Sequence, residues 1–81
     1  MYVLAIFKSR RASIDFAQKL TDRGIYNAVV NTPRNANVGC GLSVKFCYRN
    51  LYTAKRIVYR GSYPSFVGFF MLSGDRLDKV G

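Results

Sequence analysis

The feature that most constrains the fold is the order in which short apolar segments alternate with two amphipathic segments of helical period. The apolar residues of the amphipathic segments recur every three or four positions, which predicts helices at Arg10–Arg23 and Leu51–Arg60. The apolar segments predict strands at about residues 2–7, 26–32, 42–48 and 66–72. The resulting order, β-α-β-β-α-β, predicts an α+β, ferredoxin-like domain whose four-stranded antiparallel sheet carries both helices on one face.

Residues with known preferences for the ends of helices and strands support these boundaries. Ser9 and Asn50 stand where a side chain that caps the first turn of a helix is expected. Gly24 and Gly61 stand where a helix ends in a left-handed residue. Pro33 keeps the residue before it extended and so ends the second strand.

Eighty-one residues are enough for one domain with a small core. We expect residues 1–72 to form that domain and residues 73–81 to form a polar C-terminal tail. Helices on one face leave the other face of the sheet with less cover, and we expect Phe66, Phe70 and Tyr2 there. A homodimer or a ligand would shield such a surface.

Cys40 is the main candidate for chemistry, because it lies between Gly39 and Gly41 in the loop before the third strand. The glycines remove neighbouring side chains and let backbone N–H groups turn toward the sulfur. Arg34 and the formal net charge of +9 favour the thiolate, which is the reactive form, and Lys45 is expected to assist. The alternative is a small buried thiol in a tight turn that needs the glycines only for its shape.

Cys47, the second cysteine, lies in the expected third strand. We interpret it as structural, with a resolving thiol as the alternative. Its position relative to Cys40 is poor for a disulfide.

The loop carries a family resemblance. Thr32-Pro33-Arg34, five further residues and Cys40-Gly41-Leu42 together resemble the signature of the selenium/sulfur carrier protein-like family of small bacterial domains. The chain departs from the family at Asn31, where proline is usual, and near Asn37, where a hydroxyl residue is usual. The resemblance implies that Cys40 takes sulfur or selenium from a donor protein, holds it as a persulfide or perselenide, and passes it to an acceptor protein. It also implies that Arg34 would steady the anion.

The main alternative is a nucleic-acid-binding module, because lysine and arginine outnumber acidic residues 13 to 4 and the predicted topology is that of the RNA recognition motif. Tyr2 fits a stacking position in the first strand, but the third strand lacks the stacking aromatic residues. We therefore expect only weak, sequence-independent binding. Five basic residues of the predicted helices could form the binding patch: Arg10, Arg11, Lys55, Arg56 and Arg60. A small regulatory or adaptor domain is the third interpretation.

Other classes of function lack the residues that they require. The chain has no histidine and no glutamate, so we expect neither a conventional enzyme nor a metal site, and no cofactor. The apolar runs at the start and at residues 66–72 are far shorter than the roughly 20 residues that span a bilayer. The first run is also a poor signal peptide, so we expect a cytoplasmic protein without a membrane partner.

Overall fold

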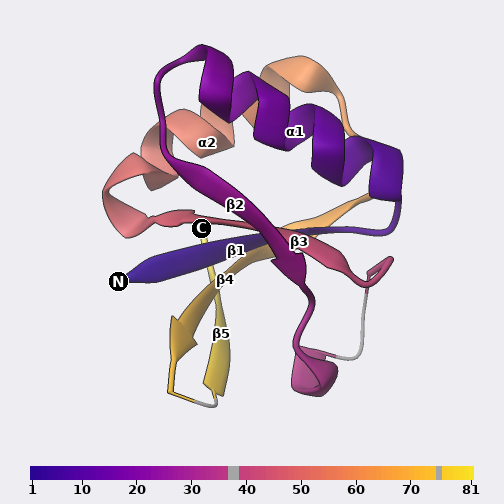
Figure 1. The fold of residues 1–81 in the computed structure, drawn as a ribbon, viewed down its shortest axis with the longest axis vertical. Helices are drawn as coiled ribbons and strands as arrows, with labels where there is room; N and C mark the ends of the chain where they lie inside the picture. The colour runs from indigo at the N-terminus through magenta and orange to yellow at the C-terminus, as the bar shows by residue number, and fades with distance from the viewer. Residues whose placement is uncertain (37–38, 75) are drawn as a thin grey trace.

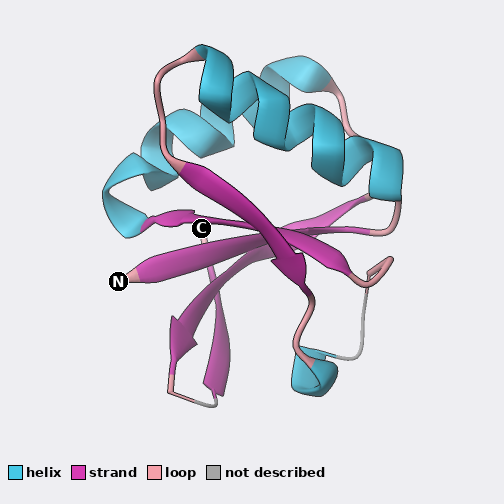
Figure 2. Ribbon diagram, viewed as in Figure 1, coloured by secondary structure: helices cyan, strands magenta, loops and turns pink. Residues whose placement is uncertain are grey.

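The computed structural model describes residues 1–36, 39–74 and 76–81, and it shows an α+β fold with two helices over one face of an antiparallel sheet (Figure 1). The helices are α1 (Arg10–Asp22) and α2 (Leu51–Gly61). The strands are β1 (Tyr2–Phe7), β2 (Asn27–Asn31), β3 (Leu42–Cys47), β4 (Phe66–Ser73) and β5 (Arg76–Val80). Two short 3-10 helices, η1 (Arg34–Ala36) and η2 (Tyr48–Asn50), complete it (Figure 2). The strand order is β2-β3-β1-β4-β5, with every neighbouring pair antiparallel.

The ferredoxin-like sheet of four strands is not matched exactly, because β5 adds a fifth strand. The segment predicted as a polar tail pairs with β4, from Ser73 opposite Arg76 to Phe69 opposite Val80. Gly74, with a φ of 61°, makes the turn between the two strands. The sequence did not predict β5 as a strand because three of its five residues are charged. Charged side chains are nevertheless typical of an edge strand, where they discourage pairing with another chain.

The core lies between the helices and the sheet. Alternate residues of β1 point toward the helices, and Val3, Ala5 and Phe7 are fully buried there. Aromatic rings fill the centre: the ring centroid of Phe7 lies 5.4 Å from that of Phe16 and 5.2 Å from that of Phe66. This burial of apolar side chains is the main force that holds the two layers together.

The opposite face of the sheet is better covered than predicted. Leu4 and Ile6 of β1 point to that face, yet they are 1% and 0% exposed. The β4–β5 hairpin and η1 lie on this side of the molecule and contact each other (Figure 1). Tyr2 is 45% exposed and Phe70 is half-buried, so part of the expected apolar surface is accessible.

The prediction that Phe66 lies on the opposite face is wrong. The pairing of β1 with β4 shifts between Ile6 and Phe7, so that Phe66 stands opposite Phe7 and packs against the core. Such a bulge changes the face to which a side chain points, and it cannot be seen in the alternation of residues along one strand.

Two of the predicted helix ends are confirmed. The Ser9 hydroxyl accepts a hydrogen bond from the backbone N–H of Ala12 at 3.2 Å, which caps α1. Gly24 has a φ of 74°, and its N–H donates to the Thr21 carbonyl at 2.9 Å. These contacts fix where α1 begins and ends.

The two predictions for α2 are wrong. The Asn50 side chain makes no capping hydrogen bond, because η2 leads directly into α2. At the other end Ser62, not Gly61, is in the left-handed conformation, with a φ of 53°. Gly61 serves close packing instead, since a Cβ there would stand 2.7 Å from the Tyr63 ring.

Candidate functional site

The two glycines beside Cys40 shape a turn at the start of β3. Gly39 and Gly41 have φ values of 92° and 94°, in the region that favours glycine. A Cβ on Gly39 would also stand 2.8 Å from Ile6 Cγ2 and 3.1 Å from the Phe7 carbonyl oxygen. A Cβ on Gly41 would meet no atom within 4 Å. Conformation alone therefore requires glycine at Gly41, whereas Gly39 is required by both conformation and packing.

Backbone hydrogen bonds tie this turn to the sheet. The Cys40 N–H donates to the Phe7 carbonyl at 3.0 Å, at the end of β1. The Thr32 N–H donates to the Gly41 carbonyl at 2.9 Å, just after β2. Cys40 is thus held at the end of the sheet where β1 leads into α1.

Two oxygen atoms lie near the sulfur of Cys40. Its Sγ atom lies 3.8 Å from the hydroxyl oxygen of Ser13 and 3.6 Å from the Leu42 carbonyl oxygen. Ser13 is fully buried in α1, and its hydroxyl also lies 3.2 Å from the Leu42 carbonyl oxygen. Cys40 itself is half-buried. The thiol therefore occupies a polar niche at the surface of the fold rather than a place in the hydrophobic core.

Sequence reasoning missed Ser13. A signal was present, because Ser13 precedes Phe16, Ala17 and Leu20 by three, four and seven positions and so shares the apolar face of α1. A serine on such a face needs a buried partner for its hydroxyl. That partner could not be named without the fold, since Leu42 and Cys40 are far from Ser13 in the sequence.

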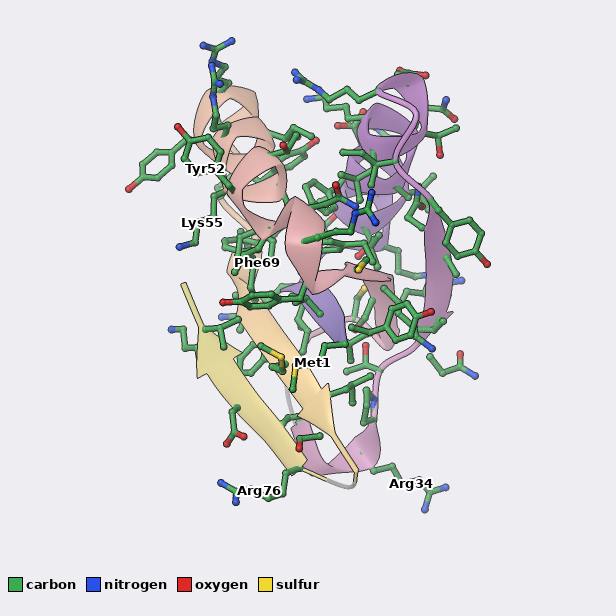
Figure 3. The ribbon with its side chains drawn as sticks, turned by 90° about the vertical axis from the view of Figure 1, so that its left-hand side faces the viewer. Met1, Arg34, Tyr52, Lys55, Phe69 and Arg76 are labelled. Carbon is green, nitrogen blue, oxygen red and sulfur yellow. The ribbon has the colours of Figure 1, made fainter. Side chains whose placement is uncertain are left out.

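The structure does not join the two predicted supporting cations to the thiol. Arg34 lies on η1 and points away from the body of the molecule (Figure 3). Lys45 lies in β3, with its amine 4.5 Å from the centre of the Tyr2 ring. Among the described residues no ion pair or hydrogen bond links either cation to Cys40. Asn37, near which we expect the sequence to depart from the family pattern, lies outside the described residues.

The second thiol lies at the other end of β3. Cys47 is the last residue of that strand and stands opposite Tyr2. The five steps from Leu42 to Cys47 span about 17 Å at about 3.3 Å per residue. Both cysteines are free, in agreement with the expectation that they do not pair.

None of the cavities lined by residues that the structure describes is shared by all five basic residues considered for nucleic acid. Lys55 lines a groove beside β4 and β5, whereas Arg11 lines a different cavity beside the connection from α2 to β4. The guanidinium of Arg56 lies 6.0 Å from the centre of the Tyr52 ring. Arg10 and Arg60 are exposed on α1 and α2.

A polar cluster that the sequence did not predict joins α1 to the segment after α2. The Tyr63 hydroxyl donates to an Asp15 carboxylate oxygen at 2.5 Å, and the Lys19 amine lies 3.5 Å from the same oxygen. The hydrogen bond from Tyr63 is the main reason that the pKa of Asp15 is lowered. Partial burial and the same hydrogen bond raise the pKa of Tyr63, and the Tyr63 hydroxyl is the main cause of the raised pKa of Lys19.

The part of the chain that the structure describes contains no group of three or more histidine, cysteine or acidic residues that could hold a metal ion. Neither of its two α-helices has the length and apolar character needed to cross a bilayer.

Comparison of the sequence with models of known protein families finds a match. Residues 2–64 match the family model described as "Putative Se/S carrier protein-like". The chain belongs to this family. The matched segment runs from β1 to just beyond α2 and includes the turn that holds Cys40. Searches of curated proteins and of solved structures find no match.

Proposed function

We propose that the protein carries sulfur or selenium, with Cys40 as the residue that holds the transferred atom. The observation that carries the proposal is family membership, since the match to a selenium/sulfur carrier model covers the whole segment around Cys40. The geometry supports it, because Cys40 is half-buried in a turn with polar neighbours rather than packed among apolar side chains. A carrier thiol must be reached by other proteins, which full burial would prevent.

The transfer needs no oxidant, metal or cofactor. The Cys40 thiolate attacks the outer sulfur of a persulfide on a donor protein, so a new S–S bond forms at Cys40 while the S–S bond of the donor breaks. The donor leaves as a thiolate and takes up the proton that Cys40 lost. An acceptor thiolate then attacks the outer sulfur on Cys40 in the same way. With a perselenide, selenium takes the place of the outer sulfur.

Ser13 is the positioning residue of this proposal. Its single hydroxyl proton has three acceptors within reach: the Ser9 carbonyl at 3.3 Å, the Leu42 carbonyl at 3.2 Å and the sulfur at 3.8 Å. A thiol donates to the Leu42 carbonyl, whereas a thiolate is an anionic acceptor for the Ser13 hydroxyl. Rotation of one hydroxyl can therefore support the ionised sulfur without any movement of the backbone.

The partners follow from the chemistry. A carrier of this kind meets one protein that donates the atom and one that accepts it, and it acts as a shuttle rather than as a conventional enzyme. Persulfide transfer requires free thiols, which persist in the reducing environment of the cytoplasm. We therefore place the proposed function in that compartment.

Mass spectrometry of the intact protein after incubation with sodium polysulfide tests the proposal. We expect a gain of one sulfur atom, which dithiothreitol removes, and we expect Cys40→Ser to abolish it. Cys47→Ser is the matched control and should load like the original protein. Loading that persists in Cys40→Ser and disappears in Cys47→Ser would overturn the assignment. Incubation with a cysteine desulfurase and cysteine then asks whether a protein donor loads the same residue.

A further inference from the structure

A second candidate site lies away from Cys40, in a groove between α2 and the edge of the sheet formed by β4 and β5. Its volume is about 420 Å³, within the range of about 300–1,000 Å³ that is usual for small-ligand sites. The pairing of β5 with β4 ends where Val80 stands opposite Phe69. Among the residues that the structure describes, the first ones of β4 therefore have no strand beside them on that side, and the groove lies there.

The walls of the groove are mainly apolar. They include Val58 from α2, Phe66 and Phe69 from β4, and Val80 from β5. All four pack against or belong to the hydrophobic core, so the groove exposes part of the core to solvent. An apolar surface of this kind favours a ligand with an apolar body.

Two lysines line the groove, one from α2 and one from β5. Lys55 extends from α2 and lies against Gly81, and Figure 3 shows it on the side of the molecule where β5 ends. Lys79 comes from β5, and its Cε atom lies 3.0 Å from the place of a Cβ on Gly68. Neither amine forms an ion pair with a carboxylate of the described residues. The groove thus combines mainly apolar walls with two lysine side chains.

We propose that this groove binds a small amphipathic anion, namely an organic acid with a single carboxylate and an apolar chain or ring. The carboxylate would accept charge-assisted hydrogen bonds from Lys55 and Lys79, which are stronger than neutral ones. The apolar part would cover Val58, Phe66 and Phe69. The site does not include Cys40, so this proposal stands independently of the carrier function.

Octanoate is a suitable probe, with octanol as the uncharged control of the same chain length. We expect isothermal titration to show saturable 1:1 binding of octanoate, at least about tenfold tighter than that of octanol. Octanoate should shift the NMR resonances of Val58, Phe69 and Val80. Resonances that shift elsewhere, or an absence of saturable binding, would overturn the proposal.

The high net charge of the protein requires a control for unspecific attraction of anions. The double variant Lys55→Gln, Lys79→Gln should weaken octanoate binding by about tenfold or more and leave octanol binding unchanged. The double variant Lys8→Gln, Arg49→Gln removes the same charge from exposed positions that do not line the groove, and its affinity should change by less than about twofold. Equal losses in the two double variants would show unspecific attraction and refute the site.

A second copy of the chain could also cover the groove. Sedimentation and NMR spectra recorded at two protein concentrations without ligand distinguish a dimer that covers the groove from a monomer whose groove is open. A dimer whose formation shifts the resonances of Val58, Phe69 and Val80 would contradict the small-molecule proposal.

Discussion

Replacing each of the two glycines beside Cys40 by alanine tests how the turn is held. Both residues have a positive φ, 92° at Gly39 and 94° at Gly41, so each alanine carries a conformational penalty of about 1–2 kcal/mol. Only at Gly39 does the new methyl group meet other atoms, with Ile6 Cγ2 at 2.8 Å and the Phe7 carbonyl oxygen at 3.1 Å. Such overpacking costs about 1–3 kcal/mol more.

The expected loss of unfolding free energy is therefore about 1–2 kcal/mol for Gly41→Ala and about 2–5 kcal/mol for Gly39→Ala. Urea unfolding followed by circular dichroism measures both values under the same conditions. Because alanine restricts the unfolded chain equally in the two variants, their difference isolates the packing of Gly39 on β1. Equal losses, or a larger loss for Gly41→Ala, would refute the packing argument.

Two further predictions concern side chains that the sequence did not single out. Ser13→Ala should slow alkylation of Cys40 by iodoacetamide at neutral pH by about threefold or more, since one hydrogen bond contributes about 1 kcal/mol. The matched control is Ser43→Ala, because Ser43 is also fully buried and its hydroxyl forms a hydrogen bond with the Thr32 hydroxyl. Neither Ser43→Ala nor Arg34→Ala should slow the alkylation of Cys40 appreciably. Equal slowing in all three variants would contradict the role of Ser13. Tyr63→Phe should destabilise the protein near pH 7, and the difference should shrink as the pH falls below about 3.8, the ordinary pKa of Asp15. The difference in stability should shrink in this direction because the hydrogen bond that lowers the pKa of Asp15 stabilises the folded state only while Asp15 is ionised. A stability difference between Tyr63→Phe and the original protein that persists unchanged to about pH 3 would show that Tyr63 acts without Asp15.

The elements that the sequence predicted well are those whose signals are local. Periodicity predicted the ends of both helices to within one residue. Ser9 and Gly24 mark the two ends of α1 through hydrogen bonds with residues three positions away in the sequence. Strand β1 reads as a continuous apolar run because both of its faces are buried. Local patterns of this kind require no knowledge of the rest of the fold.

Apart from the two ends of α2, the features that the sequence did not predict depend on contacts between distant segments. Phe66 lies against the core because the pairing of β1 with β4 shifts between Ile6 and Phe7. Strand β5 is present because its residues pair with β4, with Leu77 opposite Leu72 and Val80 opposite Phe69. Arg34 precedes Cys40 by only six residues, yet η1 directs it away from the body of the molecule. Ser13, 27 residues away in the sequence, contacts the sulfur instead. Proximity in sequence therefore suggested Arg34 as a neighbour of the thiol, whereas the fold brings Ser13 to it.

The two proposed sites can be tested separately because they occupy different parts of the fold. The family match ends at residue 64, so it covers Cys40 and Ser13 but neither β4 nor β5. The groove depends on those two strands, and only α2 contributes to it from within the matched segment. If Cys40 is the carrier residue, Lys55→Gln with Lys79→Gln should load with sulfur as fully as the original protein. If loading instead falls in that variant while Lys8→Gln with Arg49→Gln loads normally, the groove and the thiol act together, and the independence argued from their positions is wrong.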